Sequence, residues 1–161
     1  MHIWTIEKWK KEYGSDYEKL RQGIYVRYEK EVDPEVRQAC IEFCRWMRRE
    51  YFFPQRITMY VKASRRIRAM DGEMVCGTIW LPDNKLEEPY IKASTGDYYE
   101  LLEESGRDGA LAAILRTIAR ELTHYFQWIN NLCLTSIGEE RQAKAYAGFI
   151  VDEYAQTRDH P

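Results

Sequence analysis

The sequence predicts an α+β fold in which helices pack against one face of a small mixed or antiparallel sheet. Runs of alternating or β-branched residues lie in the first two thirds of the chain, and long runs with helical spacing fill the last third. Strands followed by consecutive helices are typical of the α+β class. With 161 residues, 45% hydrophobic and 31% charged, the chain has the length and composition of one globular domain over 1–161.

The N-terminal part is predicted to be helical and then to enter a first strand. Residues 3–12 and 15–22 form short helical pieces broken at Gly14, which makes 1–22 an N-terminal helical extension. The run IYVRYEKEV (24–32) alternates apolar and polar residues, as a strand does.

A helix is expected over 34–51. Asp33-Pro34 favours its start, because an aspartate cap followed by proline at the first helical position is preferred, and Pro54 ends it.

Three further strands are predicted in the middle of the chain. RITMYVKA (56–63) and VCGTIWLP (75–82) are β-rich, and the turn-prone Asp71-Gly72 lies between them, so a hairpin-like pair is expected over 57–82. PYIKAST (89–95) predicts a short strand that ends at Gly96.

The last third predicts three helices. The first, YYELLEES (98–105), stops at Gly106, and a long helix follows from about Asp108 to Asn131. After the loop LTSIG, a final helix is expected from Glu139 to about Tyr154.

Charge and composition argue against two classes of partner. The net charge of −2 gives no overall attraction for nucleic acid, and the basic runs 45–49 and 65–68 are short and balanced by acids, so no nucleic-acid partner is expected. The N-terminus lacks the apolar run of a signal peptide, and no segment approaches the length of a membrane span. A cytoplasmic protein without a membrane partner is therefore expected.

The four cysteines are predicted to be reduced core thiols. Cys40, Cys44, Cys76 and Cys133 lie in hydrophobic contexts without CxxC spacing. Cys40 and Cys44 are one helical turn apart, so a shared metal ion is the alternative to simple packing.

The stretch AILRTIARELTHYFQWIN (113–130) carries the candidate site. Positions i and i+4 of a helix stand on one face, so two histidines at this spacing converge on one tetrahedral zinc ion. A glutamate that follows the first histidine reaches the metal-bound water as a general base. Here Arg120 and His124 occupy the two ligand positions, and Glu121 occupies the position of the base.

The chain resembles the zincin metallopeptidases of the compact gluzincin type. The resemblance rests on ARELTHYFQW and on the downstream helix E-x-x-A-x-x-Y-A (140–147), and it extends more loosely over about 24–155. It implies that Glu121 is the catalytic general base, that His124 and Glu140 are metal ligands of a zinc cofactor, and that Gln127 supports the site by hydrogen bonding.

The resemblance also concerns the substrate. It implies that the strand over 90–95 runs along the upper rim of the cleft and pairs with an extended peptide. Tyr146 is one of several tyrosines available to stabilise an oxyanion, and the sequence does not choose among them.

Arg120 departs from the family pattern. A guanidinium has no lone pair to donate to a metal, and at about 5 Å from Zn²⁺ it would add roughly 6 to 7 kcal/mol of repulsion. Zinc is therefore expected to be absent or weakly bound. Arg120 is instead expected to stand among Glu121, His124 and Glu140 as a substitute cation that holds the last two helices together.

Three functions remain open from the sequence. The first is a zincin-fold protein with a degenerate RExxH...E site, inactive or weakly active as a peptidase, that serves as a peptide-binding or regulatory module. The second is an active zinc-dependent peptidase with an unusual metal site. The third is a small α+β interaction protein without a catalytic site.

Overall fold

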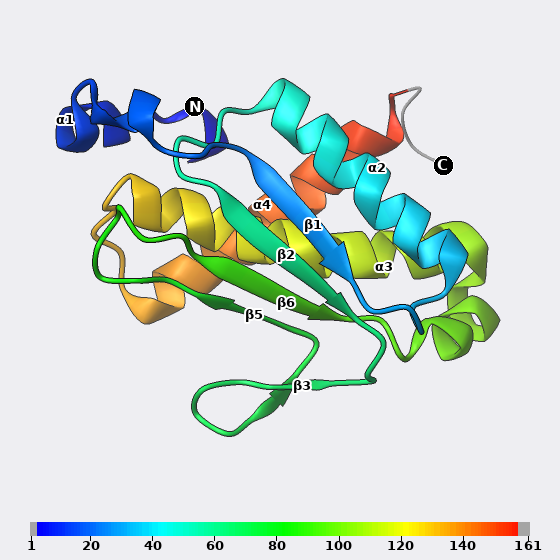
Figure 1. Cartoon of the computed structure of the whole chain (residues 1–161). Helices are drawn as coiled ribbons and strands as arrows, with labels where there is room; N and C mark the ends of the chain where they lie inside the picture. Colours follow the sequence, from blue (N-terminus) through cyan, green and yellow to red (C-terminus); the bar gives the residue numbers. More distant parts are fainter. Residues whose placement is uncertain (1–2, 158–161) are drawn as a thin grey trace.

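A computed structural model describes residues 3–157 of the protein, and in this range the fold is α+β. Figure 1 shows the elements, which follow one another as η1 (Ile3–Thr5), α1 (Trp9–Tyr13), η2 (Asp16–Lys19), β1 (Ile24–Tyr28), α2 (Pro34–Glu50), β2 (Ile57–Lys62), β3 (Ile67–Arg68), β4 (Met74–Val75), β5 (Gly77–Trp80), β6 (Tyr90–Ser94), α3 (Tyr98–Ile129) and α4 (Ser136–Ala155).

The main sheet has four strands in the order β1-β2-β6-β5. β1, β2 and β6 are parallel, and β5 is antiparallel to β6, so the sheet is mixed. α3 and α4 pass behind the sheet in Figure 1, and a small antiparallel pair, β3 with β4, projects beyond the β5 side.

The predicted pairing of the central strands is wrong in two respects. β2 and β5 do not form a hairpin-like pair over 57–82, because β6 lies between them. The Asp71-Gly72 turn instead connects β3 to β4. The strand predicted at 90–95 is internal rather than at the rim, and β5 is the edge strand. Strand pairing depends on long-range packing, which local composition does not encode.

The helices agree better with the expectation, because their end signals are local. At the start of α2, Asp33 Oδ1 accepts a hydrogen bond from the Glu35 amide at 2.9 Å, with Pro34 at the first position. α3 contains a break at Gly106, whose φ of +73° favours glycine, so the two predicted helices meet there. α4 begins at Ser136, earlier than expected, because the Thr135 side chain accepts from the Gly138 amide.

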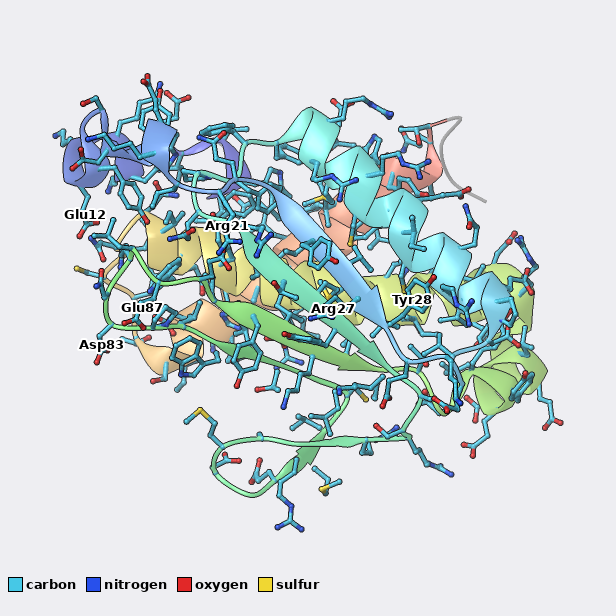
Figure 2. All side chains as sticks on the ribbon, in the orientation of Figure 1. Glu12, Arg21, Arg27, Tyr28, Asp83 and Glu87 are labelled. Atoms are coloured by element: carbon cyan, nitrogen blue, oxygen red, sulfur yellow. The ribbon has the colours of Figure 1, made fainter. Side chains whose placement is uncertain are left out.

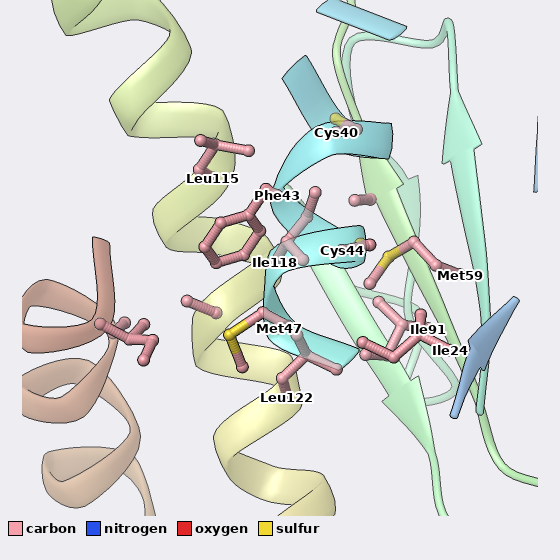
Figure 3. Close-up of a cluster of buried hydrophobic side chains, with 14 of the residues drawn as sticks. Ile24, Cys40, Phe43, Cys44, Met47, Met59, Ile91, Leu115, Ile118 and Leu122 are labelled. Carbon is pink, nitrogen blue, oxygen red and sulfur yellow. The ribbon is translucent and has the colours of Figure 1, made fainter. Parts of the chain in front are cut away.

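The core lies where α2 and α3 pack against the same face of the sheet. Figure 3 shows Phe43 and Met47 of α2 on the side of that helix that faces α3, with Met59 and Ile91 of the sheet on its other side and Ile118 of α3 nearby. All five side chains are buried. The sheet, α2 and α3 therefore stabilise one another through a single apolar cluster.

The N-terminal segment packs against this core. Trp4 and Trp9 are buried, and the Trp9 amide donates to Asn130 Oδ1 at the end of α3. None of the helices within residues 3–157 is both long and apolar enough to cross a membrane.

The prediction of core thiols is right for two cysteines and wrong for the other two. Cys40 and Cys44 are free and buried, and burial raises the pKa of the Cys44 thiol to about 12. Cys76 and Cys133 are exposed, because they lie in the connections before β5 and after α3 rather than in those elements.

The central position of Ile118 gives a direct test of this core. Ile118→Ala is expected to lower the free energy of unfolding by about 2 to 5 kcal/mol, because it leaves a cavity between α2 and α3. Ile137→Ala is the matched control, since Ile137 is 67% exposed at the start of α4, and it is expected to change stability little. Chemical denaturation measures both, and equal effects would contradict this position of the core.

Candidate functional site

The candidate site lies where α3 passes between the edge strand β5 and the first turns of α4. α3 presents Arg120, Glu121, His124 and Gln127 over two turns, and α4 contributes Glu140. Three of these side chains are sheltered, because α3 is buried almost all round in this region: Glu121, His124 and Gln127 are buried polar residues. The two helices therefore bring together all five residues singled out in the sequence.

The Glu140 carboxylate lies between two nitrogen groups of α3. Arg120 Nη2 donates to Glu140 Oε2 at 2.7 Å, and His124 Nε2 is 3.3 Å from Glu140 Oε1. The predicted proximity of Glu140 to His124 and Arg120 is thus present. The side chains of Arg120 and Glu140 are 50% and 55% exposed, so solvent weakens this pair.

A hydrogen-bond network fixes the ring of His124. Gln127 Nε2 donates to the Glu139 carbonyl at 3.0 Å and to Gln142 Oε1 at 2.9 Å, which leaves Gln127 Oε1 as the acceptor for His124 Nδ1 at 2.8 Å. Nδ1 therefore carries a proton. The remaining nitrogen, Nε2, faces Glu140 and either bears a second proton or offers a lone pair. Gln127 has the orienting position expected of it.

Glu121 is the most unusual group in the site. Its side chain is only 5% exposed, and within residues 3–157 it makes no hydrogen bond. Burial raises the pKa of Glu121 above its usual value, while His124 and Arg120 act in the opposite direction and Glu140 adds to the rise. A buried carboxyl with a raised pKa is a candidate general acid or base.

Gly77 of β5 explains how Glu121 is covered. A Cβ atom at Gly77 would lie 2.6 Å from Thr117 Cγ2 and 3.5 Å from Glu121 Cγ. Only glycine therefore lets the edge strand come this close to α3. The sequence indicated a strand here but gave no signal for this contact.

The expectation that Arg120 stands among Glu121, His124 and Glu140 as a substitute cation is only partly met. Arg120 binds Glu140, but it forms no hydrogen bond with Glu121 within the described residues. The hypothesis that it holds α3 and α4 together also needs correction, because a half-exposed ion pair contributes at most about 1 kcal/mol. The contact between the helices rests instead on buried apolar residues of α4, namely Ala143, Ala147, Ile150 and Val151.

The donor set does not fit a zinc ion. Zinc sites of this type need three side chains that can donate a lone pair, and Arg120 occupies the first position with a permanent positive charge. Arg120 also engages the carboxylate of Glu140, the expected third ligand. Within residues 3–157, no group of three or more His, Cys, Asp and Glu side chains has the arrangement of a metal site.

A hollow of about 190 Å³ adjoins His124 beyond the end of β5. Its lining includes Trp128 and Lys85, and the Lys85 ammonium lies 4.8 Å from the Trp128 ring. A second, more open hollow of about 700 Å³ lies outside the Arg120–Glu140 pair. Tyr146 lines neither: its ring packs against Trp4 at 4.9 Å between ring centroids.

Sequence reasoning did not assign Trp128 to the site, although its position four residues after His124 places it on the same side of the helix. Spacing from His124 was the available signal.

No family model matches the chain, and neither a curated protein nor a solved structure matches it. The resemblance to zincins therefore remains a hypothesis that rests on residues of α3 and α4.

The raised pKa of Glu121 makes a prediction about stability. The native protein keeps the Glu121 proton at pH values where the unfolded chain has lost it, so stability falls as the pH rises from the usual glutamate pKa through the raised one. Glu121→Gln removes this loss. The melting temperature of the variant is expected to exceed that of wild type at pH 8 and to equal it near pH 4.

Glu104→Gln is the control, because Glu104 is an exposed glutamate of the same helix. A pH-independent difference between Glu121→Gln and wild type would contradict a buried carboxyl with a raised pKa.

Proposed function

We propose that the protein is a peptide-binding module with a degenerate zincin-like site, in which Arg120 replaces the catalytic metal ion. The Arg120–Glu140 ion pair is the observation that carries this proposal. A zinc ion at His124 and Glu140 would have to displace a guanidinium that binds Glu140 at 2.7 Å, and no other residue in the described range replaces the missing ligand.

The edge of β5 supports the assignment to an extended peptide. Ser94 donates its amide to the Cys76 carbonyl, so Cys76, Thr78 and Trp80 form the hydrogen-bonded pairs with β6. The N–H and C=O groups of Gly77 and Ile79 consequently point away from the sheet. An extended peptide can pair with these groups as an added strand.

Side-chain recognition would come from the groups next to this edge. The hollow lined by Trp128 and His124 lies just beyond the strand, and its mixed polar and apolar lining suits a peptide side chain that has both apolar and polar groups. The carboxyl of Glu121, covered by Gly77, lies under the same edge, so a peptide that binds there would keep it shielded from water.

A second candidate is a zinc-dependent peptidase. The orientation of His124 by Gln127 and the raised pKa of Glu121 favour it, because a metalloenzyme needs an oriented imidazole and a carboxyl of this kind. It requires another group to take the position of Arg120. Stoichiometric zinc in the purified wild-type protein would favour this candidate over the first.

Arg120→His tests the origin of the site. This substitution supplies the missing imidazole and frees Glu140, so the variant is expected to bind roughly one zinc ion per chain, measured by metal analysis after dialysis. Arg120→Gln is the matched control, because it removes the charge without adding a ligand, and it is expected to bind almost none. If Arg120→His binds no more zinc than Arg120→Gln, the zincin-like assignment of the site is wrong.

Ile79→Pro tests the peptide-binding edge. Proline removes the outward N–H of residue 79 but no bond within the sheet, so an edge strand tolerates it. On an array of unrelated peptides of about twelve residues, wild type is expected to retain a subset, and Ile79→Pro to lose it. Ile79→Ala shortens the same side chain but keeps the N–H, and it should retain binding. Equal losses in both variants, or no retained peptide for wild type, would refute the proposal.

A further inference from the structure

The face of the sheet that points away from the helices carries two rows of aromatic and basic side chains. Residues that are paired between adjacent strands lie on the same face of the sheet. Gly77, Met59 and Ile91 face α2 and α3. Because side chains alternate along a strand, the residues before and after these three face away from the helices. The outward residues align across β1, β2, β6 and β5 as Tyr25, Thr58, Tyr90 and Trp80 in one row, and as Arg27, Tyr60, Lys92 and Thr78 in the next. These eight residues with Lys62 form the aromatic–basic face.

Three of the four rings of this face contact one another. Trp80 stacks on Tyr90 with 5.5 Å between ring centroids and 26° between ring planes, and Tyr60 meets Tyr90 edge-on at 6.0 Å. Tyr25 is 49% exposed at the β1 side. Because strands are about 4.8 Å apart, rings are spread across about 14 Å from β1 to β5.

Basic groups stand among these rings. The charged groups of Arg27, Lys62 and Lys92 lie 5.5 to 6.0 Å from the centroids of Tyr25, Tyr60 and Tyr90. Within residues 3–157 these three cations form no ion pair.

Figure 2 shows Arg27 on the sheet face that is turned to the viewer, away from α3 and α4. Two acids border this face. The Glu29 carboxylate accepts from the Ala63 amide, and Glu88 pairs with Arg56, whose guanidinium lies 5.3 Å from the Tyr25 ring.

We propose that the aromatic–basic face binds single-stranded nucleic acid. Unpaired bases stack on aromatic side chains, while cations between the rings contact the phosphates. An acidic peptide would use the cations but not the four rings, and a neutral glycan would use the rings but not the cations. Duplex DNA is read by an element that enters a groove, and no helix within residues 3–157 stands on this face.

This inference reverses the expectation of no nucleic-acid partner. That expectation considered the net charge and the basic runs 45–49 and 65–68, and none of these residues belongs to the aromatic–basic face. The register of the sheet gathers its cations from three separate strands, β1, β2 and β6. The face is also distinct from the outer edge of β5, so the inference does not depend on the proposed peptide binding.

Fluorescence anisotropy with labelled oligo(dT) and oligo(U) of about twelve nucleotides tests the stacking surface at low salt. Tyr25→Ala and Trp80→Ala are each expected to weaken binding about tenfold, and Trp80→Phe, which keeps a ring, much less. Phe149→Ala is the matched control, because Phe149 is 59% exposed on α4, behind the sheet, and should have no effect. Melting temperatures show that each variant is folded.

The salt dependence tests the cations independently. Three phosphate contacts predict a slope of about −2 for log K against log salt concentration, and Lys92→Gln should reduce its magnitude by about 0.7. Lys144→Gln on α4 should leave the slope unchanged. The proposal is overturned if Tyr25→Ala binds the oligonucleotides as tightly as Phe149→Ala does, or if a duplex binds as tightly as the single strands. It is also overturned if poly-glutamate of the same total charge displaces the bound oligonucleotides. Tighter binding of oligo(dT) or of oligo(U) identifies the natural ligand as single-stranded DNA or RNA.

Discussion

The close approach of β5 to α3 at Gly77 is the constraint on which the site depends. A side chain at residue 77 would collide with Thr117, so the strand would move away from the helix and expose Glu121 to water. Solvation would then remove the burial that raises the pKa of Glu121. The same approach leaves the outer edge of β5 directly above the site. One glycine therefore links the electrostatics of a buried carboxyl to the geometry of a strand edge.

The Arg120–Glu140 pair has a different role from the apolar contacts around it. It is half exposed, and pairs of this kind add little to the free energy of folding. Its effect is on the chemistry of the site, because it neutralises Glu140 and excludes a second cation from the space next to His124. The buried stripe of α4 stabilises the helix pair whether or not Arg120 is present.

The sequence predicted those parts of the structure that have local causes. Asp33-Pro34 and Gly106 mark helix ends by their own backbone preferences, and the i, i+4 spacing was enough to place Arg120 and His124 on one side of α3. The proximity of Glu140 was implied by the resemblance of these two helices to the active-site and glutamate helices of zincins. The order of the strands could not be predicted in this way, because β2, β5 and β6 have similar compositions and differ only in their long-range partners. The contact at Gly77 and the aromatic–basic face both depend on that order.

The alternation of side chains along β5 keeps the two proposed surfaces separate. Gly77 and Ile79 turn towards α3 and leave their backbone groups at the open edge, while Thr78 and Trp80 turn to the opposite face and bond to β6. A ligand that pairs with the edge and a ligand that stacks on the face therefore contact different atoms of the same four residues. The two proposed surfaces therefore do not compete for any group of β5.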